Sequence, residues 1–399
     1  MKYRSLGKTG IEVSEIGIGT EHFPADKEIM AEILAVAVES GLSFIDILQT
    51  DPAGDGAYIW NGLGPLIKKY RDKLVLAAHW GIGYNYDLSY CRQTFPEALS
   101  QAGNEYIDVA MMTMVGESGR EDEWIEESLK DLSRYQERGH IGCIGASAHD
   151  ISAAIKLVKS GMLDVLMFTV NMTQSGDTQH QELYQACIEN EVGLIAMKSY
   201  SAGLLLNVES KPTTITPVQC LSYVLSQPVS TTAVGIKNAD ELRAALGYCS
   251  ATTSEKDYQP ALDNLHQELA GHCVYCNHCL PCEEGINITS VVSINNWAKW
   301  GVQDWLEGMY SALPVKPTAC IGQGDCMERC AFDVDIIGKM RHVVAVFEWD
   351  LWGKREEDEL QEMARSLGID EASKMSKGIL IDSIRRVDPD LLYSGLDQG

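Results

Sequence analysis

Eight short apolar runs alternate with helix-period segments in the N-terminal part of this 399-residue chain. The segments between the runs, such as residues 27–40 and 181–191, have the spacing of amphipathic helices. Strands that alternate with helices form parallel βαβ units, and eight such units predict an α/β protein built on a (β/α)8 TIM barrel. The expected strands are residues 15–19, 43–48, 74–78, 107–112, 141–146, 165–170, 193–198 and 231–235.

The chain is longer than one barrel, which takes about 250 residues. We expect the barrel in residues 1–250, with an opening hairpin that turns near residues 7–10 and plugs one end. Beyond it the sequence predicts a linker helix at 251–270, a small domain at 271–345 with the cysteine spacing of a ferredoxin-like iron–sulfur domain, and a C-terminal helical tail at 346–399. The charged segment 340–367 has a helical pattern. The polar remainder is expected to lie over the barrel or to be partly loose.

Seven of the twelve cysteines form two runs in the C-terminal part of the chain. The first run is Cys273-x-x-Cys276-x-x-Cys279-x-x-Cys282, and the second is Cys320-x-x-Gln323-x-x-Cys326-x-x-x-Cys330. Paired Cys-x-x-Cys motifs also make zinc sites, but two interlocked runs are typical of two-cluster ferredoxins, in which the last cysteine of each run binds the other cluster. By that rule Cys273, Cys276, Cys279 and Cys330 hold one complete [4Fe–4S] cluster.

The second site, with Cys282, Cys320 and Cys326, lacks one thiolate at Gln323. Three states remain open for it: a [3Fe–4S] centre, no cluster, or a [4Fe–4S] centre whose unique iron takes Gln323, Asp325, water or substrate. An open iron is a Lewis acid, whereas an altered ligand can also simply shift a redox potential. The five scattered cysteines, which we expect to be buried apolar residues, are Cys91, Cys143, Cys187, Cys220 and Cys249.

The net charge of −25 comes from 57 acidic and 32 basic side chains. Such a charge disfavours nucleic acid and anionic membranes, and it suits either solubility or a basic redox partner protein. No apolar run reaches the roughly 20 residues that span a bilayer, and the charged opening segment does not have the pattern of a signal peptide. We therefore expect a cytoplasmic protein without a membrane partner.

Several segments resemble the aldo/keto reductases, especially the prokaryotic branch with a C-terminal ferredoxin-like domain. The opening from Tyr3 to Thr20 is similar to that family's start, and Gly41-Leu-Ser-Phe-Ile-Asp46 is similar to its second strand. Further matches are Glu137-Arg-Gly-His-Ile-Gly-Cys-Ile-Gly-Ala-Ser147, Ala196-Met-Lys-Ser-Tyr-Ser-Ala-Gly203, Val234-Gly-Ile-Lys-Asn-Ala-Asp-Glu-Leu242 and the Cys279-Leu-Pro-Cys282 end of the first cysteine run. The resemblance covers residues 1–345.

The resemblance implies carbonyl reduction with NAD(P)H by a tyrosine that an aspartate, a lysine and a histidine tune. Asp46 takes the aspartate position, but Asp51, His79 and Thr113 stand where the tyrosine, lysine and histidine are expected. Asp51 and His79 could handle protons instead. Tyr58, in a loop expected at residues 51–61, could bring a phenol to the position of the missing tyrosine. The aromatic segment 80–86, with Trp60 and Tyr58, could form a wall of the site.

The same resemblance implies that groups after the later strands hold the nucleotide. These candidates are Ser147, Asn171, Lys198, Gly235, Lys237 and Arg243. The family's Glu-Asn pair is replaced by Ala244-Ala245, which weakens adenosine recognition.

Three functions therefore stay open. The first is a redox enzyme that passes electrons between clusters, with or without NAD(P)H, and a small organic substrate. The second is a lyase or dehydratase that uses an open iron, and the third is a non-catalytic electron-transfer subunit.

Overall fold

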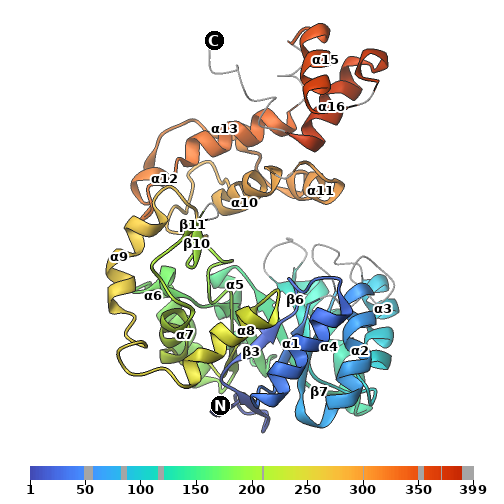
Figure 1. Cartoon of the computed structure of the whole chain (residues 1–399), viewed down its shortest axis with the longest axis vertical. Helices are drawn as coiled ribbons and strands as arrows, with labels where there is room; N and C mark the ends of the chain where they lie inside the picture. The colour runs from blue at the N-terminus through green and yellow to red at the C-terminus, as the bar shows by residue number, and fades with distance from the viewer. Residues whose placement is uncertain are drawn as a thin grey trace. The chain divides into compact units, whose positions relative to one another are not determined.

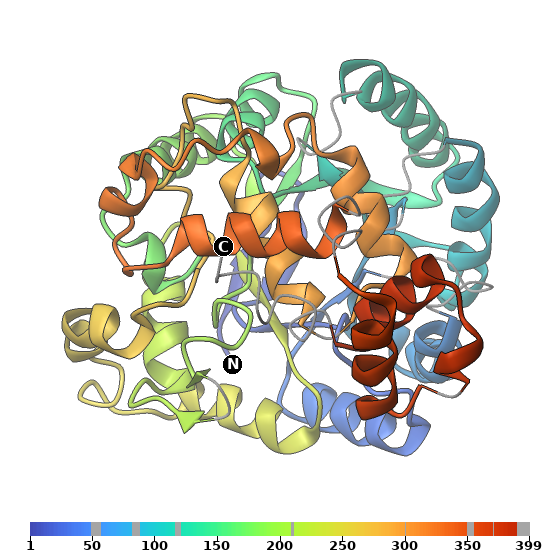
Figure 2. The same cartoon turned by 90° about the horizontal axis from the view of Figure 1, so that it is seen from above.

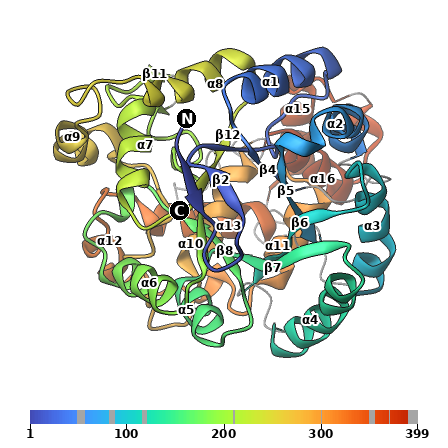
Figure 3. The same cartoon turned by 90° about the horizontal axis from the view of Figure 1, so that it is seen from below.

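Eight parallel strands close into a barrel in this computed structural model, in the order β12, β3, β4, β5, β6, β7, β8, β9 (Figure 3). The described residues are 1–48, 57–81, 88–115, 121–208, 211–299, 301–348, 355–369 and 371–388. The strands are β3 Gly17–Gly19, β4 Phe44–Ile47, β5 Val75–Trp80, β6 Ile107–Val115, β7 Ile141–Ala148, β8 Val165–Thr169, β9 Gly193–Met197 and β12 Thr231–Gly235. All eight expected strands are present, so the predicted (β/α)8 barrel is confirmed.

Helices follow the strands and cover the outside of the barrel (Figure 1). They are α1 Lys27–Glu39, α2 Ala57–Tyr70, α3 Leu88–Gln101, α4 Glu121–Glu137, α5 Ile151–Lys159, α6 Thr178–Glu189, α7 Pro217–Ser226 and α8 Ala239–Leu246. Side-chain caps fix several starts, because an oxygen at the N-cap accepts from a free backbone N–H of the first turn. Asp150 caps α5, Asp177 caps α6 and Asn238 caps α8 in this way.

The opening hairpin, β1 Tyr3–Ser5 and β2 Glu12–Ser14, lies across one end of the barrel (Figure 3). Leu6 and Val13 are fully buried in a cluster with residues that line the barrel interior, including Phe44. Gly7 has a φ of +55°, and a Cβ there would come within 2.4 Å of the Gly193 backbone nitrogen. Glycine is therefore required where the hairpin approaches the barrel, and the plug expected from the sequence is present.

One expectation about the segment between β4 and α2 is wrong. Tyr58 was expected in a loop that could move, but it lies in the first turn of α2, which begins at Ala57. A helical backbone fixes the direction of a side chain far more closely than a loop does. The Tyr58 side chain itself is outside the described residues.

A short hairpin is inserted between β9 and α7, and several shorter helices follow the barrel. The remaining elements are β10 Asn207–Val208, β11 Lys211–Pro212, α9 Gln259–Leu269, α10 Ile288–Ala298, α11 Asp304–Ala312, α12 Asp325–Glu328, α13 Ile336–Phe347, α15 Glu357–Ser366 and α16 Lys377–Val387, with 3-10 turns η1 Arg71–Lys73, η2 Met172–Gln174, η3 Gly247–Cys249, η4 Pro317–Ala319 and η5 Ala372–Lys374. The chain divides into two compact units, Met1–Glu268 and Leu269–Gly399.

The C-terminal unit, drawn from orange to red in Figure 2, is helical, and its described residues include no strand. Its expected likeness to a ferredoxin therefore rests on the cysteine spacing. Helices α10 and α13 pack together, and the Asn295 side chain lies 2.7 Å from His342 Nδ1 between them. No helix in the described part of the chain has both the length and the apolar character to cross a membrane.

The helical tail expected at 346–399 includes a helix in the polar part that we expected to lie over the barrel or to be partly loose. Residues Lys377–Val387 form α16, and its Leu380 and Ile384 are fully buried against Leu360 of α15. The expectation of a loose polar remainder is thus wrong for this segment. The overall polarity concealed an apolar stripe at helical spacing.

Candidate functional site

Three polar side chains meet at the carboxyl ends of neighbouring barrel strands. Asp46 belongs to β4, His79 to β5 and Thr113 to β6. His79 Nε2 lies 3.0 Å from Asp46 Oδ1, and His79 Nδ1 lies 3.2 Å from Thr113 Oγ1. All three residues are buried, with at most 5% exposure. The carboxyl ends of strands are where barrel enzymes place their chemistry, so these predicted residues form one connected group.

The hydrogen bonds favour one arrangement of protons in this group. Thr113 Oγ1 donates to the Gly81 carbonyl at 2.9 Å, and a hydroxyl has only one proton to donate. We therefore assign Thr113 Oγ1 as the acceptor from His79 Nδ1, one of the two directions that this contact allows. In that arrangement the contact between His79 Nε2 and Asp46 needs a further proton on one of the two, since two bare acceptors would repel each other. The Asp46–His79 pair then shares this proton.

Two other predicted catalytic side chains cannot be placed. Asp51 lies outside the described residues, as does the side chain of Tyr58. In the aromatic wall expected around the site, the prediction is wrong for Trp80, which is fully buried in the packing outside β5. Trp60 is fully buried on α2, and its place in the wall stays a prediction.

Trp80 belongs to a structural cluster. Its ring packs edge-on against Phe95 and Tyr135, with centroid separations of 5.3 and 6.2 Å. Its Nε1 donates to Ser128 Oγ at 3.1 Å. Edge-to-face rings and a satisfied indole N–H are typical of a packed core.

Three of the expected nucleotide contacts lie at the ends of β7, β8 and β9. Ser147 is buried on β7. Asn171 accepts from Thr173 N at 3.0 Å and donates to the Lys198 carbonyl at 2.9 Å, so its amide joins two loops. The Lys198 ammonium donates to His149 Nε2 at 3.0 Å. His149 was missed by sequence reasoning, although a histidine directly after a barrel strand is a recognisable signal.

The other three candidates surround the start of α8, where a phosphate was expected. Asp240 and Glu241 occupy the first turn of this helix, and Glu241 accepts from the Lys237 backbone N–H at 2.8 Å. Gly235 ends β12 just before it. Arg243 forms ion pairs with Asp240 at 2.7 Å and with Glu32 at 3.0 Å.

A helix N-terminus attracts anions through its free N–H groups, and here the Asn238 side chain accepts a hydrogen bond from one of them, that of Glu241, at 2.9 Å. The two ion pairs of Arg243 lie at the surface and do not prevent this side chain from binding a phosphate. The nucleotide contacts expected here stay a prediction.

In the C-terminal unit, cysteines from both runs line one small cavity. Cys273, Cys276 and Cys279 come from the first run and Cys330 from the second. The other walls are mainly apolar and comprise Val274, Asn277, Ile288, Thr289, Val292, Phe332, Val334 and Ile336. Burial and the neighbouring thiols raise the pKa of Cys279 to about 12. The structure therefore brings together the four residues expected to hold one cluster.

The backbone of the first run has an uncommon shape. Tyr275 and Asn277, on either side of Cys276, have φ values of +58° and +65°. Residues other than glycine seldom adopt this left-handed conformation. Alternating right- and left-handed residues point successive N–H groups inward, and such nests bind anionic groups including iron–sulfur clusters.

The second run repeats this shape around the missing thiolate. Gly322 and Gly324, on either side of Gln323, have φ values of +71° and +100°. Gln323 Nε2 donates to Asp325 Oδ2 at 3.3 Å. The thiols of Cys282 and Cys320 are both close enough to raise the pKa of Cys326, although burial is the larger cause. Gln323 thus has the same backbone setting as Cys276.

These thiols surround their sites without converging on a point. Among the described residues, no three His, Cys, Asp or Glu side chains form a group that could hold a single metal ion. Four of the five scattered cysteines are buried as expected, but Cys249 is exposed. That expectation is wrong for Cys249 because η3 leaves its side chain at the surface.

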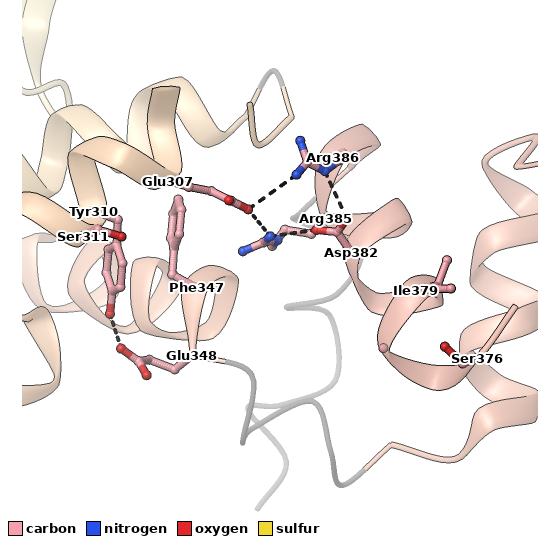
Figure 4. A pocket seen from close by; sticks show the side chains of 11 residues that line it. Glu307, Tyr310, Ser311, Phe347, Glu348, Ser376, Ile379, Asp382, Arg385 and Arg386 are labelled. Carbon is pink, nitrogen blue, oxygen red and sulfur yellow. Dashed lines mark hydrogen bonds and ion pairs between the residues drawn. The ribbon is translucent and has the colours of Figure 1, made fainter. Parts of the chain in front are cut away.

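A separate cavity of about 680 Å³ lies between α11, the end of α13 and α16 (Figure 4). Its charged side chains are already joined to one another. Arg385 pairs with Glu307 and with Asp382, the latter at 2.8 Å, while the Tyr310 hydroxyl donates to Glu348. This network holds α16 against the rest of the unit.

Comparison with known proteins identifies the barrel. The model of the aldo/keto reductase family matches residues 15–219. The chain belongs to the aldo/keto reductase family. The match ends before the cysteine runs, so it bears on the barrel alone. Members of this family are oxidoreductases, and the expected enzyme class is therefore confirmed.

Individual aldo/keto reductase relatives are distant in sequence. The chain is 22% identical over 214 residues to the "Uncharacterized oxidoreductase YqkF" of Bacillus subtilis, covering 51% of this chain and 67% of that protein. It is 24% identical over 219 residues to "L-galactose dehydrogenase" of Arabidopsis thaliana, with the same coverage. The holo form of aldo-keto reductase AKR11C1 from Bacillus halodurans superposes with a TM-score of 0.54 at 19% identity, over 66% of this chain and 96% of that one. This last likeness shows the fold.

Proposed function

We propose that this aldo/keto reductase is a cytoplasmic iron–sulfur oxidoreductase that acts on a small organic substrate. Its cysteine-bound clusters exchange electrons with a basic redox protein, and the Asp46–His79 pair supplies or accepts protons in the barrel. The observation that carries the proposal is the cavity that Cys330, from the second run, shares with Cys273, Cys276 and Cys279 from the first.

The residues around this cavity fit a [4Fe–4S] cluster. When bound, such a cluster supplies one-electron transfer. Four thiolates would be its ligands, and left-handed residues such as Tyr275 and Asn277 occur in the backbone nests that bind anionic groups. The apolar walls, which include Ile288 and Phe332, exclude water and thereby influence the reduction potential.

The second site fits a cluster with one corner that has no thiolate. Cys282, Cys320 and Cys326 are its sulfur ligands, and the loop keeps the left-handed glycines on both sides of Gln323. The Gln323 amide and the Asp325 carboxylate are the side chains nearest in sequence to the vacant position. We assign either a [3Fe–4S] centre or a [4Fe–4S] centre with a non-cysteine ligand to this site.

In the barrel, the Asp46–His79 pair is suited to proton transfer. Reduction of a carbonyl to an alcohol adds two electrons and two protons. A proton held between a carboxylate and an imidazole can be given to a developing alkoxide and replaced from solvent. Thr113 fixes the ring orientation by accepting from His79 Nδ1. We assign the electrons to the clusters and derive no step through NAD(P)H.

Anaerobic reconstitution of the whole protein with ferrous iron and sulfide tests the proposal. We expect about eight iron atoms per chain and a visible absorption that dithionite bleaches. The Cys330→Ser variant should lose about half of the iron, because it removes a ligand of the complete site. Cys249→Ser is the matched control, since Cys249 is exposed in the barrel unit. Equal iron contents in the two variants would contradict the assignment of Cys330 as a ligand.

Adding NADPH to the same reconstituted protein tests the source of electrons. We expect no bleaching, since the proposal draws the electrons of the clusters from a redox protein. Rapid bleaching by NADPH would show that the nucleotide binds and donates electrons, contrary to this assignment.

A lyase or dehydratase is the second candidate, and the thiolate-free corner at Gln323 favours it. An iron without a fourth thiolate can bind a substrate hydroxyl as a Lewis acid. A change in the EPR spectrum of the reconstituted protein on adding hydroxy acids would support this candidate. An unchanged spectrum, with substrate-dependent oxidation of the clusters, would support the redox enzyme.

A further inference from the structure

The two cysteine sites differ at one thiol in their access to solvent. In the first site Cys279 is buried in the apolar cavity, while Cys273, Cys276 and Cys330 are partly exposed. The second site has no buried thiol, since Cys282, Cys320 and Cys326 are all partly exposed. If both sites hold clusters, as in the proposed function on which this inference rests, the second site is the more accessible to another protein.

Large apolar side chains lie exposed beside these thiols. Ile321 follows Cys320 and has 68% of its surface exposed, and Met327 follows Cys326 with 37% exposed. In the described part of the chain, Ile321 is the large apolar residue with the highest exposed fraction. A soluble protein gains nothing from such exposure at one loop, whereas an interface has an apolar centre.

Carboxylates lie close in sequence to the thiols of the second site. Glu283 and Glu284 follow Cys282, and Glu328 ends α12; all three are exposed. Asp325 at the start of α12 is half-buried. Arg329 is the one cation between Cys320 and Cys330. It donates to the Cys279 and Pro281 carbonyls at 2.7 and 2.8 Å and so joins the two cysteine runs.

We propose that Ile321 and Met327, with the rim of Glu283, Glu284 and Glu328, form the docking surface for a basic electron-transfer protein. The acidic rim complements a basic partner and increases the rate of encounter. The small apolar centre suits the short-lived, low-area contacts of redox pairs. One electron passes between the second site and the partner in each encounter, without any bond being formed.

Stopped-flow oxidation of the reconstituted, dithionite-reduced protein by mitochondrial cytochrome c tests this surface. Cytochrome c is basic, and its ferric haem takes one electron. We expect a second-order rate that falls steeply as salt is raised, because screening weakens the attraction. A Glu283→Gln, Glu328→Gln double variant should react about tenfold more slowly at low salt. Ile321→Ser should slow the reaction at all salt concentrations.

Two controls separate this surface from other causes. Glu123→Gln removes an exposed carboxylate on α4 of the barrel unit and should leave the rate unchanged. Oxidation by a small neutral quinone should be the same in all variants, which shows that the clusters are unaltered. Identical cytochrome c rates for the wild type and the double variant, with full iron content, would overturn the docking surface. Absence of iron would instead refute the proposed function.

Discussion

His79 Nε2 lies 3.0 Å from Asp46 Oδ1, and the two side chains are buried together at the ends of adjacent strands. A buried carboxylate without a partner is strongly destabilising. His79→Ala should therefore lower the free energy of unfolding by about 3–5 kcal/mol. The Asp46→Asn, His79→Gln double variant should recover part of that loss, because it buries no uncompensated charge. Chemical denaturation of the three proteins measures the difference, and equal losses in both variants would contradict a coupled pair.

The position of the proton on the His79 ring can be observed directly. Since Thr113 donates to the Gly81 carbonyl, we expect Nδ1 of His79 to carry a proton at neutral pH. Nitrogen-15 NMR of histidine-labelled protein should show a protonated Nδ1, and Thr113→Val should change that signal. An unprotonated Nδ1 would mean that Thr113 donates to the ring instead.

Trp80 should affect stability rather than turnover. Trp80→Phe keeps the edge-on contacts in part but leaves Ser128 Oγ without its donor. We expect a loss of about 1–3 kcal/mol in the free energy of unfolding, with little change in substrate reduction. In the Ser128→Ala background the same change should cost less, which a double-variant cycle would measure. A large fall in turnover with unchanged stability would show instead that Trp80 contributes to the active site.

The barrel should lose stability in alkali. Burial raises the pKa of Cys187 from 9.0 to about 12, and burial likewise raises that of Cys220 to about 12. Unfolded thiols ionise near 9, while the native ones keep their protons, so the unfolded state binds fewer protons in between. Stability is thus complete below about 9 and falls as the pH rises toward 12. Denaturation at several pH values should show a shallower fall for Cys187→Ala; parallel curves would contradict this origin.

The ion pairs that hold α16 should weaken in acid. Burial would raise the pKa of Asp382, but hydrogen bonds from Arg385 and Arg386 outweigh it, and the pKa lies below its ordinary value of 3.8. The stabilisation is therefore complete above about 4 and is lost as the pH falls through the lower native value. Pepsin should cut residues 377–387 increasingly over this range. In Asp382→Asn the helix should be cut more readily at mild pH and show less acid dependence.

The barrel could be predicted because each strand is a short apolar run bounded by polar segments, and such runs have few alternatives. The spacing of the two cysteine runs also predicts cluster ligands, and that prediction remains to be tested. What failed depended on tertiary context. Trp80 at a strand end has the same sequence pattern whether its ring faces substrate or packs on Phe95. Likewise, the packing of α16 could not be predicted, because its three buried apolar residues lie among charged ones and their partner helix is not known from the sequence.

The glycines on both sides of Gln323 have an evolutionary consequence. Glycine loses more conformational entropy on folding than any other residue, so a loop freed from cluster binding would be expected to replace it. This loop keeps Gly322 and Gly324 in the left-handed conformation that Tyr275 and Asn277 adopt around Cys276. A single Gln323→Cys replacement would therefore put a fourth thiol into a backbone already shaped to receive it, one substitution away from two equivalent clusters.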